Sequence, residues 1–146
     1  MKKPVPAAPA ADKYEIRPDQ SVELLKALHI LTRDGKMNQD SRRKLKQVQH
    51  LVQFIAPLIA KQLADHQSVT LVDHGAGKSY LGFILYDLCL KGVDAASLAQ
   101  SKIIGIETRD ELVARSRELA QRCGFAQMTF LNLSVADSIT SPQLPA

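Results

Sequence analysis

The stretch Val69-Thr-Leu-Val-Asp73-His-Gly75-Ala-Gly77-Lys-Ser-Tyr-Leu81 decides the fold of this chain. A short apolar run ends in Asp73, two glycines separated by one residue follow, and an amphipathic segment then begins. This order predicts a strand, a tight turn and a helix, in which the turn lacks side chains so that a ligand can approach its backbone. The identity of that ligand therefore decides the function.

Apolar runs and amphipathic segments continue to alternate after this stretch. Strands are predicted at residues 69–72, 102–107 and 128–133, and helices at about 79–90 and 109–123, the second ended by Gly124. Strands that alternate with helices of this length indicate βαβ units and a parallel sheet. The predicted fold class is α/β and Rossmann-like, with three parallel strands and flanking helices.

The first half of the chain has a different pattern. Residues 18–31 and 38–63 carry helical stripes of apolar side chains, and Pro57 is expected to kink or split the second helix. The predicted organisation is a disordered Ala/Pro-rich tail at 1–17, a helical region at 18–65 and a partial Rossmann-like domain at 66–146. Parallel sheets are normally buried on both faces, so three strands predict only the first half of a doubly wound domain.

Composition excludes several classes of protein. The apolar fraction of 45% and the charged fraction of 23% are typical of soluble globular proteins. Cys89 and Cys123 form no CxxC pair, which argues against a disulfide framework or a zinc site, and no apolar run is long enough for a membrane span. Prolines interrupt the first residues where a signal peptide would be apolar. These features predict a cytoplasmic protein without a metal site or a membrane contact.

Positive charge is concentrated in the first fifty residues, which hold eleven Lys/Arg against six Asp/Glu. The densest cluster consists of Arg42, Arg43, Lys44 and Lys46. Phosphates would bind such a cluster without any reading of sequence, so it is the candidate contact for RNA or another anionic acceptor. No aromatic stacking platform adjoins the cluster in the sequence, and a solvated helix face is the competing interpretation.

Glycine spacing separates three classes of ligand for the turn. A P-loop needs another glycine five residues before Gly77, where this chain has Val72, and Asp73 would repel a triphosphate. A dinucleotide fold needs a small residue at the third glycine position, where this chain has Tyr80. An acidic residue two positions before Gly75 instead suits a ligand that has a cationic end and no phosphate.

These residues resemble a known family. The run from Val72 to Leu81 is similar to motif I of class I S-adenosylmethionine-dependent methyltransferases, in the branch that reads D-x-G-x-G-K-x-Y-L. Gly105-Ile106-Glu107, followed by Arg109 and Leu112, resembles the second motif of that branch, and residues 130–139 resemble the third. The resemblance covers roughly residues 41–140.

The resemblance implies S-adenosyl-L-methionine as cofactor and the following binding residues: Asp73, Gly75, Gly77, Lys78, Glu107 and Asp137. Asp73 would counter the cofactor's ammonium, Glu107 would accept from both ribose hydroxyls, and Asp137 would approach the adenine amino group. Three of these residues have a plainer interpretation, since Asp73 could cap a helix, Glu107 could favour a helix dipole, and Lys78 could lie on a helix surface.

The resulting hypothesis is a methyltransferase whose catalytic residues are unknown, because in this fold the acceptor side comes largely from the fourth strand onward. The chain is expected to hold the cofactor-binding half and to lack turnover alone. In the family the fourth strand pairs with the first, so residues 69–72 are expected to form an exposed edge that promotes self-association. A non-catalytic RNA- or protein-binding module is the alternative, and a P-loop protein is the less favoured one.

Overall fold

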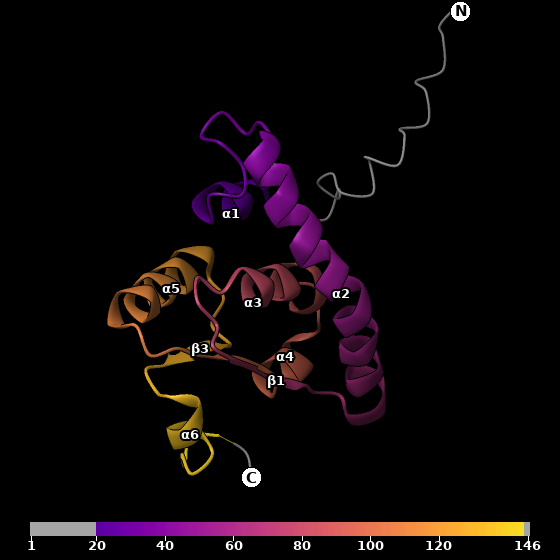
Figure 1. Cartoon of the computed structure of the whole chain (residues 1–146). Helices are drawn as coiled ribbons and strands as arrows, with labels where there is room; N and C mark the ends of the chain where they lie inside the picture. Colours follow the sequence, from indigo (N-terminus) through magenta and orange to yellow (C-terminus); the bar gives the residue numbers. More distant parts are fainter. Residues whose placement is uncertain (1–19, 145–146) are drawn as a thin grey trace, which may run out of the picture.

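The computed structural model describes residues 20–144 and contains a three-stranded parallel sheet (Figure 1). The strands are β1 (Thr70–His74), β2 (Lys102–Ile106) and β3 (Met128–Leu131), in the order β1-β2-β3. Val72 lies opposite Ile104 in the first pair, and Ile104 lies opposite Thr129 in the second. The predicted α/β class, with three parallel strands and flanking helices, is confirmed.

Helices connect the strands mainly on one side of the sheet. Helix α3 (Tyr80–Leu85) passes directly into a π-helix, η2 (Tyr86–Leu90), and α4 (Ala95–Ala99) follows before β2. Helix α5 (Asp110–Cys123) joins β2 to β3, and Gly124 ends it at a φ of 71° as predicted. Figure 1 shows α3 and α5 above the sheet and α6 (Val135–Ser138) below it.

The two faces of the sheet are buried by different segments, because successive side chains of a strand point to opposite faces. Ile103, Met128 and Phe130 face the helices, where the Phe83 ring stacks on that of Phe130 with centroids 5.8 Å apart. On the opposite face Ile104, Ile106 and Leu131 form a small second core against Val72, Leu133 and Leu144. Both faces of the strands therefore contain buried side chains.

Helix α2 (Gln39–His66) is one continuous helix of 28 residues, so the prediction that Pro57 could split it is wrong. Pro57 removes the donor that would bond to the Gln53 carbonyl. Both residues lie on the exposed side of α2, where water can take the place of that donor. The buried side of α2 packs on α3 and η2 through residues that include Leu45, Val48, Val52 and Ile59.

Other element boundaries differ from the predicted ones. Helix α1 (Val22–Ala27) is shorter than the predicted helix at 18–31. Ser21 is its N-cap, and the Ser21 hydroxyl accepts from the Leu24 N–H at 3.1 Å. The predicted loop before β2 contains α4, and the predicted tail at 1–17 lies outside the described residues. No described helix combines the length and the apolar character needed to cross a bilayer.

Candidate functional site

A left-handed turn leaves β1 at the edge of the sheet where the carboxyl ends of the three strands meet. Gly75, Gly77 and Ser79 have φ values of 70°, 61° and 63°. This conformation costs a residue with a side chain roughly 1–2 kcal/mol, which explains the two glycines. Ser79 adopts it without being glycine.

The turn is fixed to the end of β2 and leaves its own backbone accessible. The Ala76 N–H donates to the Ile106 carbonyl at 2.9 Å. A Cβ on Gly105 would lie 3.3 Å from the Ala76 side chain and 3.0 Å from the Phe130 ring, so glycine at this position favours close packing of the turn on β2. A Cβ on Gly75 would meet no atom within 4 Å. The space beside Gly75 is therefore free of other described atoms.

Glu107 follows β2 directly, and its buried carboxylate is engaged by four donors. One oxygen, Oε1, accepts from the Gly77 N–H at 2.9 Å and from Arg109 Nη2 at 3.4 Å. The other, Oε2, accepts from the backbone N–H and the side-chain Nε of Arg109, both at 2.9 Å. These bonds, those of the Arg109 side chain first, lower the pKa of Glu107 to about 2. Glu107 is thus ionised and holds the turn in place.

Asp73 is the fourth residue of β1, and its half-buried carboxylate has no such partners. Among residues 20–144 no group donates a hydrogen bond to it. Burial raises the pKa of Asp73, and the neighbouring His74 opposes that shift only in part. A carboxylate that is partly removed from water and lacks a donor favours the approach of a cation.

The other two charged residues assigned from sequence lie on exposed surface. Asp137 is in α6, where its backbone N–H donates to the Ser134 hydroxyl at 3.0 Å. That helix reaches the end of β1, because the Ser138 hydroxyl lies 3.4 Å from His74 Nδ1. Lys78 is exposed and lines a separate cavity between α3 and α5. The cofactor roles of Asp137 and Lys78 stay predictions.

Two residues that complete this edge were not assigned to the site from sequence. Arg109 occupies both oxygens of Glu107, and the side-chain amide of Asn132 donates to the carbonyls of Glu107 and Thr108 at 3.1 and 3.0 Å. The available signal was position, since Arg109 stands two residues after Glu107 and Asn132 directly follows β3. The described residues hold no group of three or more His, Cys, Asp or Glu side chains placed to bind a metal ion.

The fold and this edge define a partial Rossmann-like α/β domain with a ligand site at the carboxyl ends of its strands. Comparison with protein families matches residues 43–146 to the family described as a methyltransferase domain. The match covers more than half of the chain, and the chain belongs to this family. It begins within α2 and includes all three strands. Comparisons with curated proteins and with solved structures gave no match.

Proposed function

We propose that this methyltransferase domain binds S-adenosyl-L-methionine at the 75–79 turn. The observation that carries the proposal is the Asp73 carboxylate, which is half-buried, has no donor among the described residues and stands two residues before the open backbone of Gly75. The methionine end of this cofactor carries an ammonium, which such a carboxylate would attract. Membership of the methyltransferase family supports a methyl donor as the ligand.

Glu107 could bind the ribose of the same ligand if the Arg109 side chain moved away from its carboxylate. A carboxylate can accept hydrogen bonds from two hydroxyls, but the Arg109 side chain now uses part of this capacity. That side chain is 60% exposed, so it can move into water at small cost. The Gly77 N–H can remain bonded to Oε1 and keep the carboxylate in place. Asp137 remains the proposed contact of the adenine amino group.

The chemistry follows from the ligand and from the way in which the chain would hold it. When bound, S-adenosyl-L-methionine supplies a methyl group activated by the adjacent sulfonium. Asp73 would fix the amino-acid end, Glu107 the ribose, and the turn would bring its backbone against the cofactor. The contribution of these residues is therefore alignment of the donor with an acceptor, and we propose no catalytic residue.

Isothermal titration calorimetry of S-adenosyl-L-methionine into the full chain tests the proposal. Asp73→Asn and Glu107→Gln are each expected to weaken binding about tenfold or more, since a charge-assisted hydrogen bond contributes roughly 1.5–3 kcal/mol. Asp65→Asn is the matched control, because Asp65 is a surface carboxylate at the end of α2 that pairs only with Lys61 in the described structure. Absent heat, or equal affinity in all four proteins, would reject the cofactor assignment. Heat with ATP and magnesium that is lost in Lys78→Ala would indicate a P-loop protein instead.

We also propose that a second copy of the chain pairs with the free edge of β1. The two edges of the sheet differ: on β3, the Arg117 guanidinium donates to the Phe130 carbonyl at 2.6 Å and so protects that edge. β1 bonds to β2 alone in the described sheet. An unprotected edge strand is a template for pairing. Light scattering is expected to show dimers whose proportion rises with concentration. Thr70→Lys on β1 should abolish these dimers, while the control Thr129→Lys on β3 should retain them. A monomer at all concentrations would contradict this proposal.

A further inference from the structure

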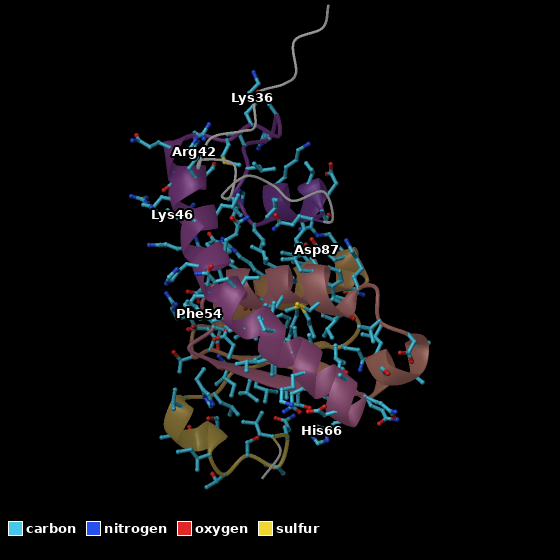
Figure 2. All side chains as sticks on the ribbon, turned by 90° about the vertical axis from the view of Figure 1, so that its right-hand side faces the viewer. Lys36, Arg42, Lys46, Phe54, His66 and Asp87 are labelled. Carbon is cyan, nitrogen blue, oxygen red and sulfur yellow. The ribbon has the colours of Figure 1, made fainter. Side chains whose placement is uncertain are left out.

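The outward side of α2 carries a stripe of exposed side chains that the methyltransferase site does not use. Residues spaced by three and four positions share one side of a helix. The stripe consists of Arg43, Gln47, His50, Phe54 and Leu58, all exposed, and it lies opposite the buried stripe of α2. Phe54 is 61% exposed and Leu58 is 63% exposed. Figure 2 shows Arg42, Lys46 and Phe54 projecting from the same side of this helix.

An open groove of about 1140 Å³ lies beside the first part of this stripe, and Arg43, Gln47 and His50 line it. Its charged lining residues are Arg43 and Lys46, and none of the described residues that line it is acidic. Gln47, His50 and Gln53 add polar groups to its walls, while Val52, Ala56 and Leu88 provide apolar surface. A groove with this lining complements a ligand that is anionic, forms hydrogen bonds and has flat apolar parts.

The His50 ring lines the groove, and the exposed Phe54 ring adjoins it from outside the groove. The rings of His50 and Phe54 meet edge to face, with centroids 5.4 Å apart and planes at 83°. A hydrogen bond of 3.2 Å between Gln53 Nε2 and His50 Nδ1 holds the imidazole. One helical turn separates His50 from Lys46, and another separates Phe54 from His50.

The basic start of α2 also lies close to the methyltransferase site. Lys44 interacts electrostatically with Tyr80, the first residue of α3. Tyr80 is only three residues beyond Gly77 in the left-handed turn.

From these contacts we propose that the α2 groove binds single-stranded RNA. Arg42, Arg43 and Lys46 contact phosphates, and an unpaired base stacks on the exposed face of the Phe54 ring, which His50 supports from its edge. Basic residues beside an aromatic ring are the combination that single-strand binders use. The amides of Gln47 and Gln53 offer hydrogen bonds to 2′-hydroxyls and base edges. The inference rests on the proposed function only in making this RNA the methyl acceptor, since the binding itself needs no cofactor.

Fluorescence anisotropy with a labelled oligouridylate of roughly a dozen nucleotides tests the inference on the full chain without cofactor. Phe54→Leu keeps an apolar side chain but removes the ring, and it is expected to weaken binding about fivefold or more. Arg42→Gln and Lys46→Gln are each expected to weaken binding and to lower the slope of log affinity against log salt by roughly 0.7. Lys61→Gln, on the same side of α2 but about four turns beyond Lys46 and about five beyond Arg43, is the matched control and should bind as the unaltered chain does.

Several outcomes would overturn this inference. They are undetectable binding, unchanged affinity of a Phe54→Leu variant whose unfolding midpoint is also unchanged, or tighter binding of a single DNA strand of the same length or of duplex RNA. Loss of a dimer in Phe54→Leu, without any RNA binding by the unaltered chain, would assign the stripe to a protein interface. Because RNA binding is measured without cofactor and cofactor binding without RNA, failure of one titration leaves the other result standing.

Discussion

Two carboxylates, Asp73 and Glu107, stand at the ends of neighbouring strands and have opposite surroundings. Glu107 accepts hydrogen bonds from Gly77 and Arg109, and its pKa is lowered to about 2. Asp73 has no donor among the described residues, and burial raises its pKa. The register places Asp73 opposite Gly105, and Glu107 follows Gly105 by two residues, so the two carboxylates lie at the same end of neighbouring strands. The number of hydrogen-bond donors around each carboxylate therefore distinguishes the two residues.

The difference indicates that Glu107 stabilises the fold at this edge of the sheet, while Asp73 is the residue available to a ligand. Glu107 stabilises the folded turn before any ligand is bound, because its charge is compensated by the protein. Asp73 is not compensated, so the domain bears a cost that a cationic ligand could remove. Under the proposed function, both residues contact the cofactor, but only Asp73 would gain its first partner on binding. The predictions below test this contrast.

The largest expected effect is on stability in the absence of ligand. Glu107→Gln should lower the free energy of unfolding by about 2–3 kcal/mol, since it weakens bonds to Gly77 and Arg109 in a buried location. Asp73→Asn should leave stability equal or slightly higher. Urea unfolding of both variants measures the difference. Equal losses in the two variants would show that Asp73 also has a structural partner.

The next effect concerns the left-handed backbone of the turn between the two carboxylates. Gly77 is left-handed at a φ of 61°, and an added Cβ would approach only Arg109 Nη2, at 3.8 Å. Gly77→Ala should therefore cost about 1–2 kcal/mol through backbone strain alone. Ser79→Gly should stabilise by up to about 1 kcal/mol, because Ser79 now adopts the same conformation with a side chain. Thermal or urea unfolding checks both, and destabilisation in Ser79→Gly would show that its contact with the Ser116 hydroxyl matters more.

The two carboxylates should also give opposite pH dependence. The pKa of Glu107 is depressed from 4.5 to about 2, so its stabilising contribution is complete above about pH 4.5 and is lost as the pH falls through about 2. The pKa of Asp73 is raised above 3.8, so the folded state favours its protonated form and loses stability as the pH rises through that region. In urea unfolding from pH 7 to pH 2, the deficit of Glu107→Gln should disappear in acid. A deficit that persists at pH 2 would contradict the assigned cause.

Much of this edge could be predicted from sequence because its signals are local. The alternation of apolar runs and amphipathic segments located all three strands, and glycine spacing located the left-handed turn. The resemblance placed Asp73 and Glu107 near that turn. Both Gly75 and Gly77 have the positive φ that makes glycine favourable, which is a property of one residue and its neighbours.

The remaining features depend on tertiary contacts, which residue spacing does not reveal. Pro57 is tolerated in α2 because the affected carbonyl is on the exposed side, and that side is defined only once α2 packs on α3 and η2. The π-helix at Tyr86–Leu90 has no simple periodic signal. The hydrogen bonds from Arg109 to both oxygens of Glu107 depend on where the two side chains lie, which the sequence does not give. The exposed stripe around Phe54 was hidden for the same reason, since an apolar residue in a helix is usually expected in the core.

The smallest expected effect concerns Arg109, the residue that makes the two carboxylates different. Its side chain is 60% exposed, so Arg109→Gln should cost less than about 1 kcal/mol of stability. The same variant should bind S-adenosyl-L-methionine a few-fold more tightly by calorimetry, because Glu107 Oε2 would no longer have to exchange the guanidinium for a ribose hydroxyl. Arg115→Gln, an exposed arginine of the same helix, is the control and should bind as the unaltered chain does. Weaker binding in Arg109→Gln would instead make Arg109 a contact of the cofactor, and Glu107 would then act with its partner rather than after losing it.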